Sequence, residues 1–74
     1  MVKGKIWKKI VEKLSDINFE ARDKVIRVKS LNDGILIKAE VVGVKGIVCL
    51  EKNISEEGEI PVKVVSESEW KKLL

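Results

Sequence analysis

The chain has 74 residues, with 15 lysines and arginines against 12 aspartates and glutamates, and a net charge of +3. A domain this small buries only about 60% of the surface that its unfolded chain exposes, so its core is marginal without further support. One cysteine and no histidine exclude a disulfide framework, a Cys/His zinc site and any Ser-His or Cys-His catalytic pair.

The rest of the composition indicates an intracellular globular domain. Charged residues make up 36% of the chain, Lys, Glu, Val and Ile are abundant, and Gln and Thr are absent, a usage typical of hyperthermophile proteins. No long apolar run follows the basic N-terminus, which predicts neither a signal peptide nor a membrane span. We therefore expect one α+β domain over residues 1–74, in the cytoplasm, where the single Cys49 would stay reduced.

The first predicted element is an amphipathic helix over residues 3–14. Its apolar residues recur at helical spacing and are Ile6, Trp7, Ile10, Val11 and Leu14. Four lysines, Lys3, Lys5, Lys8 and Lys9, lie near its start, where the helix dipole disfavours positive charge. Either packing against the rest of the fold tolerates these lysines, or they serve an anionic partner. Residues 15–23 are rich in cap and turn formers, and they predict a connector.

Residues 24–52 predict three antiparallel strands. Asp33-Gly34 suits a type I′ turn between residues 24–30 and 35–42, and Gly43 and Gly46 bracket a second hairpin. In this register Arg27 faces Glu40 and Lys38 faces Glu51, and such opposite-charge pairs stabilise neighbouring strands.

The last third of the chain predicts a loop, an edge strand and a helix. Residues 52–58 form an acidic loop, and residues 59–65 alternate as a fourth strand. Pro61 lacks a backbone donor, so this strand should lie at a sheet edge. Ser66 and Glu69 fit a capping box that begins a short C-terminal helix. The predicted fold is a four-stranded antiparallel β-meander with the N-terminal helix packed on one face and a short C-terminal helix.

The two faces of this predicted sheet differ. The face assigned to the N-terminal helix carries Ile26, Val28, Ile37, Ala39, Val41, Val48 and Leu50. The opposite face is about half apolar, more than a solvated face of an antiparallel sheet should be. Its candidate self-association residues are Val25, Leu36, Val42, Ile47 and Cys49. We expect the C-terminal helix or a second copy of the chain to cover this face.

The predicted function follows from what the sequence lacks. There is no nucleophile–base pair and no glycine-rich phosphate loop, so we expect neither an enzyme, nor a cofactor, a metal or a small-molecule substrate. The leading interpretation is a non-enzymatic interaction module that forms a homodimer or binds another protein, away from membranes. The alternative is a small basic nucleic-acid-binding protein. Its candidate contacts are Lys3, Lys5, Lys8, Lys9, Arg27, Lys29 and Lys38.

Overall fold

The computed structural model describes residues 5–73. This part of the chain contains one sheet of four parallel strands in the order β1-β2-β3-β4. The strands are β1 (Lys5–Val11), β2 (Lys24–Asn32), β3 (Gly46–Asn53) and β4 (Val62–Val64). Two α-helices, α1 (Asp33–Val42) and α2 (Glu67–Leu73), and two 3-10 turns, η1 (Leu14–Asp16) and η2 (Phe19–Ala21), complete the fold. The predicted mixture of helix and sheet is correct, whereas the predicted antiparallel meander is wrong because every strand pair is parallel.

Helix α1 is the reason for the parallel sheet. The segment predicted as the second strand is helical, so the chain leaves β2, crosses one face of the sheet and re-enters it in the same direction. Asp33-Gly34 therefore belongs to the first turn of α1 and not to a type I′ turn. The Asn32 side chain caps this turn by accepting a hydrogen bond from the Ile35 amide at 2.9 Å. Gly43 ends the helix with φ of 90°, the left-handed conformation that favours glycine.

The N-terminal segment is a strand within the described residues, so the predicted helix over residues 3–14 is wrong. The register of β1 against β2 shifts between Ile6 and Ile10. This irregularity interrupts the regular alternation of a strand and leaves Trp7 and Val11 buried four residues apart. Such spacing also fits one face of a helix, which explains the misassignment. Lys3 lies outside the described residues.

Four predicted elements are present in the structure, some of them with altered bounds. Strands β2 and β3 exist, and β4 is shorter than predicted but lies at the edge of the sheet, as Pro61 indicated. Helix α2 begins where the capping motif placed it, and the Glu69 amide donates to Ser66 Oγ at 3.3 Å. The predicted pairs Arg27–Glu40 and Lys38–Glu51 do not form ladder neighbours, because Lys38 and Glu40 belong to α1.

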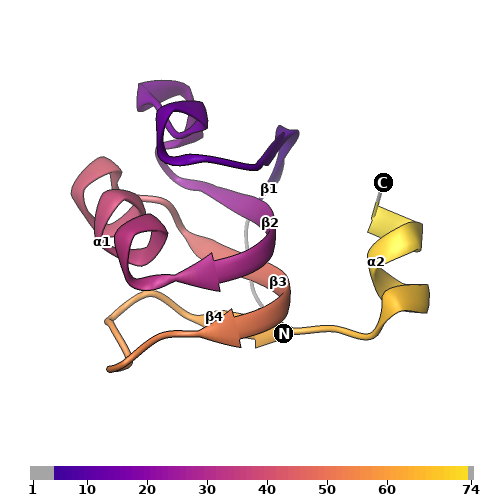
Figure 1. The fold of residues 1–74 in the computed structure, drawn as a ribbon. Coiled ribbons are helices and arrows are strands. Elements are labelled where there is room, and N and C mark those ends of the chain that lie inside the picture. The colour runs from indigo at the N-terminus through magenta and orange to yellow at the C-terminus, as the bar shows by residue number, and fades with distance from the viewer. Residues whose placement is uncertain (1–4, 74) are drawn as a thin grey trace.

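The sheet separates two unequal layers (Figure 1). Helix α1, the 3-10 turns and the loop after β3 all lie on one face, and with it they enclose the larger core. Its buried members are Trp7, Val11, Ile17, Ala21, Ile26, Val28, Leu31, Ile35, Leu36, Ala39, Val42, Val44, Ile47 and Cys49. Helix α2 lies on the other face, where Trp70 packs with Val25, Val48 and Val65 in a second, smaller core.

Arg27 joins these parts on the face that carries α2. Its side chain is only 7% exposed, and one guanidinium nitrogen donates to the carbonyls of Trp7 and Lys8 in β1 at 3.0 and 2.9 Å. The other terminal nitrogen donates to the Leu73 carbonyl at the end of α2. A positive charge at a helix C-terminus complements the helix dipole, so Arg27 anchors α2 electrostatically as well as by hydrogen bonding.

Candidate interaction surfaces

The five residues predicted as a self-association face are all buried. Leu36, Val42, Ile47 and Cys49 belong to the larger core, and Val25 belongs to the smaller one. The structure thus places them on both sides of the sheet and offers none of them to a second molecule. These residues are buried and not exposed because residues 35–42 form a helix. A helix exposes every third or fourth side chain, whereas the predicted strand would expose every second one.

The residues predicted as nucleic-acid contacts are dispersed. Lys5, Lys8 and Lys9 lie on β1, and Lys9 is 3.5 Å from Asp16 in an ion pair. Arg27 is buried on backbone carbonyls, and Lys29 lies further along β2 on the same face. Lys38 lies on α1, on the far side of the sheet. These residues do not form one surface.

The outer side of the helical layer carries the first surface that sequence reasoning missed. On α1, Ile37 is 61% exposed and Val41 is 79% exposed, although both were predicted to be in the core. Leu14 of η1, 47% exposed, lies against the first turn of the same helix, because a Cβ at Gly34 would be 3.7 Å from a Leu14 methyl carbon. We call Leu14, Ile37 and Val41 the α1 stripe. A contiguous exposed apolar strip is typical of an interaction surface.

Opposite charges flank the α1 stripe. At 100° per residue around a helix, Lys38 lies on one side of Ile37 and Val41, and Glu40 lies on the other. The Glu40 carboxylate leans toward the loop after β3, where a Cβ at Gly58 would clash with it. Hydrophobic residues between flanking positive and negative positions resemble the seam of paired helices.

The second surface lies at the amino ends of the strands. Lys5 and Lys24 are direct neighbours at the starts of β1 and β2. Lys45, immediately before β3, donates its amide to the Lys24 carbonyl at 2.8 Å and so lies beside Lys24. Lys5, Lys24 and Lys45 form a row across three adjacent strands, which we call the lysine row. Neighbouring strands are about 4.8 Å apart, so the three backbone positions span about 10 Å.

An open groove of about 570 Å³ adjoins one end of the lysine row. Its walls are Lys5, Ile6, Trp7, Lys8, Glu20 and Lys24. The Lys24 ammonium donates to the Glu20 carbonyl at 2.9 Å, and Phe19, the neighbour of Glu20, is 85% exposed. Three of the six walls are lysines, and the exposed Phe19 is the residue before Glu20, another of the walls.

No local motif in the sequence marks the lysine row. Its members are 19 and 21 residues apart, which is about one strand plus one crossover in this fold. That spacing becomes informative only when the strands are known to be parallel, because an antiparallel meander would place the same residues at different edges.

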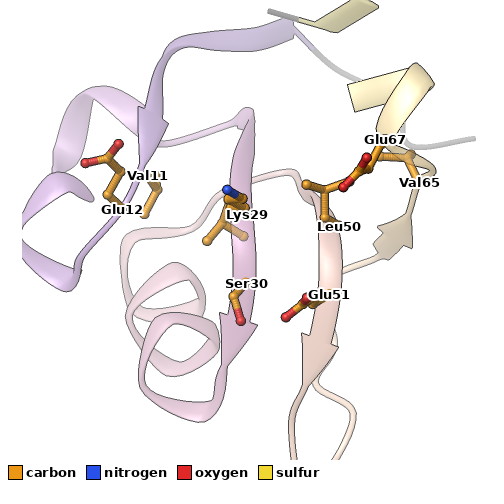
Figure 2. Close-up of a pocket in the computed structure, with 9 residues that line it drawn as sticks. Val11, Glu12, Lys29, Ser30, Leu50, Glu51, Val65 and Glu67 are labelled. Atoms are coloured by element: carbon orange, nitrogen blue, oxygen red, sulfur yellow. The ribbon is translucent and has the colours of Figure 1, made fainter. Parts of the chain in front are cut away.

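A larger open groove, of about 620 Å³, lies on the face that carries α2 (Figure 2). Figure 2 shows Lys29 of β2 between Glu12, which follows β1, and Glu67, which begins α2. Val11, Leu50 and Val65 supply apolar walls. The groove exists because the seven residues of α2 cover only part of this face. Its mixed charges favour no single ligand class.

Two titratable groups have pKa values shifted by their surroundings in the fold. Hydrogen bonds from the Ser55 amide at 2.8 Å and the Ser55 hydroxyl at 2.9 Å lower the pKa of Asp33 below its usual value. Burial raises the pKa of the Cys49 thiol, and its side chain lies in the larger core. Within residues 5–73, no three His, Cys, Asp or Glu side chains are grouped so that they could hold a metal ion.

Comparison of the chain with protein-family models, with curated proteins and with solved structures gave no match. The surfaces above are therefore the basis for any assignment of function. None of the helices in the described part of the chain is sufficiently long and apolar to cross a membrane.

Proposed function

We propose that this chain is a non-enzymatic interaction module that pairs with a second copy of itself through the α1 stripe. The observation that carries the proposal is the exposure of Ile37 and Val41 at 61% and 79% on the outer side of a helix whose inner side is fully packed. Leu14 extends the same apolar strip onto η1. Burying such a strip against another molecule removes apolar surface from water, at about 25 cal/mol per Å².

The flanking charges favour a second copy as the partner. In a parallel two-fold pairing of α1 with its counterpart, Lys38 of each copy faces Glu40 of the other across the apolar seam. An antiparallel pairing would instead place like charges opposite one another. The parallel arrangement is therefore the one that the charge pattern supports.

The size of the helix sets the expected affinity. Ten residues of α helix are about 15 Å long, so the contact lies at the small end of specific interfaces. We expect a weak dimer with a micromolar Kd and fast exchange between subunits.

The buried, unpaired Cys49 thiol supports a reducing compartment such as the cytoplasm.

Sedimentation velocity over a concentration series, up to about 500 μM, tests self-association well above the Kd of a small contact. The wild-type chain should shift from monomer to dimer, and Ile37→Lys should stay monomeric. Val64→Lys is the matched control, because Val64 is also exposed, at 51%, but lies on edge strand β4. Its dimer should persist. A wild-type chain that is monomeric throughout the series would overturn the proposal.

Charge exchange tests whether the flanks of the α1 stripe face each other across the seam. Lys38→Glu makes both flanks acidic, and Glu40→Lys makes both flanks basic, so each variant alone should dissociate. An equimolar mixture of the two variants should form a heterodimer, because every acidic flank then meets a basic one. A mixture that stays monomeric would contradict a role for these charges in pairing.

The orientation of the two helices needs a separate measurement, because the mixture would match opposite charges in the parallel and in the antiparallel arrangement alike. Gly34→Cys, in a Cys49→Ala background, places one spin label per copy near the start of α1. Parallel helices bring the two labels close together, whereas antiparallel helices separate them by about the 15 Å length of the helix. Short label-to-label distances support the parallel dimer, and long distances contradict it.

A further inference from the structure

We infer that the lysine row and Phe19 form a binding site for single-stranded nucleic acid, with the lysines on the phosphates and the phenyl ring against a base. This site is separate from the α1 stripe and does not depend on the proposed dimer. Three of its four residues, Phe19, Lys24 and Lys45, were not among the contacts expected from the sequence. Lys5, Lys24 and Lys45 follow one another at the amino ends of three strands, and Phe19 lies one residue before Glu20, whose carbonyl accepts a hydrogen bond from Lys24.

The first supporting observation is that the row is electrostatically unfavourable in the free protein. Like charges directly opposite each other on neighbouring strands are destabilising. Within residues 5–73 the ion pairs are Lys9–Asp16 and Lys52–Glu57, and neither includes a lysine of the row. The repulsion between Lys5, Lys24 and Lys45 is therefore not relieved by a carboxylate in direct contact, and an anion bound along the row would relieve it.

The linear arrangement of the lysines selects among anionic partners. The three positions follow one another at about 4.8 Å intervals along the sheet edge. A line of evenly spaced cations matches the repeating charges of a phosphodiester strand. It matches a membrane surface less well, because a membrane presents its anionic headgroups over a plane and not along a line.

Phe19 favours a single strand over a duplex. Its ring is 85% exposed, and the 3-10 turn that carries it is fixed at both sides. Asn18 caps this turn by accepting from the Glu20 amide at 2.9 Å, and Ala21 is buried in the larger core. The exposed ring is thus carried by an ordered backbone, one residue before Glu20, which lines the basic groove. Unpaired bases stack on such exposed rings, whereas bases inside a duplex are inaccessible to them.

The experiment measures fluorescence anisotropy of a labelled oligothymidine of about 15 nucleotides, a length that matches small single-strand binding sites. Three lysine–phosphate contacts predict a slope of about −2 for log affinity against log salt. Affinity should therefore fall about 20-fold between about 50 and 200 mM salt. No binding at the lower salt concentration would overturn the inference.

Matched triple variants locate the site. Lys5→Gln, Lys24→Gln and Lys45→Gln together should abolish the salt-dependent binding. The control changes Lys63, Lys71 and Lys72 to Gln, which alters the net charge equally but leaves the row intact, and it should retain most of the affinity. Equal losses in the two variants would show that binding follows net charge alone, and would contradict a site. Circular dichroism of both variants verifies that each is folded.

The ring and the class of anion are tested separately. Phe19→Leu should lower oligothymidine affinity by about tenfold, because it removes a stacking surface, while Phe19→Tyr should retain it. A duplex of the same length should bind more weakly than the single strand. Tighter binding to duplex, or binding to phosphatidylserine vesicles without binding to the oligonucleotide, would overturn the inference. Repeating the titration with Ile37→Lys separates this site from self-association.

Discussion

The Arg27 guanidinium, buried in the central strand β2, donates a hydrogen bond to the Leu73 carbonyl in the last turn of α2. The same side chain also donates to the carbonyls of Trp7 and Lys8, beside the register shift of β1. One residue therefore holds together the irregular edge strand and the helix on the second face. Its partners are all backbone groups, so the sequence contains no complementary carboxylate that would reveal its role.

Arg27→Lys should lower the free energy of unfolding by about 2–4 kcal/mol, because an ammonium cannot reproduce the fork of a guanidinium. The loss is large for a domain whose total stability is of the order of 5–15 kcal/mol. Urea denaturation measures it. Amide hydrogen exchange in α2 should accelerate in the variant more than exchange in α1, which lies on the other face. Equal acceleration in both helices would contradict an anchoring role.

Asp33 should contribute to the stability of the protein toward acid. Because its folded-state pKa is lowered by the Ser55 hydrogen bonds, its contribution is fully present above the pKa of an unfolded aspartate, about 3.9. The contribution is lost as the pH falls through the lower folded-state pKa. Asp33→Asn keeps an acceptor for the Ser55 amide but removes the titrating charge. Its stability should therefore fall less steeply below about pH 5 than that of the wild type.

Glu20→Gln is the control for this pH measurement, since Glu20 is also an exposed acidic residue in the first turn of a helical segment. Among the hydrogen bonds within residues 5–73, those of Glu20 involve its backbone and not its carboxylate, so this variant controls for the loss of one negative charge alone. Two other carboxyl groups also have lowered pKa values. Asp16 accepts hydrogen bonds from the Glu12 and Lys13 amides, and Glu57 accepts one from Lys52. Asp33→Asn should therefore reduce the acid dependence of stability without abolishing it.

Cys49 should be unreactive in the folded protein. Its side chain is fully buried in the larger core, and burial raises the pKa of its thiol, so little thiolate forms and reagents cannot reach it. The native protein should react with Ellman's reagent at about pH 8 only at the rate of unfolding, whereas the protein in denaturant should react at once. Rapid labelling of the native protein would contradict the placement of β3 in the centre of the sheet.

The elements that sequence reasoning identified are those with unambiguous local signals. Strands β2 and β3 are rich in β-branched residues, Pro61 marks an edge, and Ser66 begins a capped helix. The error lay between the two strands. The buried side chains of α1 are spaced for a helix, but the same segment also alternates well enough to resemble a strand.

The decisive signals in that segment are its two ends. Asn32 is a preferred N-cap residue and Gly43 a preferred residue after a helix, and together they bracket α1. The interpretation of Asp33-Gly34 as a hairpin turn is incompatible with both helix-end signals. A reversed strand direction changes every inference about which residues share a face. This is why the candidate self-association residues are buried, and why the α1 stripe and the lysine row were missed.

The two glycines of this segment distinguish the helix from the hairpin by experiment. Gly34 lies in the first turn of α1, and a Cβ there would lie 3.4 Å from Asn32 Oδ1, an ordinary contact. Gly34→Ala should therefore stabilise the protein by about 0.4–1 kcal/mol, because alanine restricts the unfolded chain. Gly43 has φ of 90°, so Gly43→Ala should destabilise it by about 1–2 kcal/mol.

Thermal and urea denaturation of the two variants measure these opposite signs. A type I′ turn at Asp33-Gly34 would need a positive φ at Gly34, so in an antiparallel hairpin Gly34→Ala would be destabilising. Gly46→Ala is a poor control because Gly46 is buried in β3. Gly58 lies in an exposed loop, where a Cβ would meet the movable end of the Glu40 side chain and, at an ordinary contact distance of 3.6 Å, a Leu36 methyl carbon. Gly58→Ala should change stability little. A loss of stability in Gly34→Ala equal to that in Gly43→Ala would contradict the helix and, with it, the parallel order of the sheet.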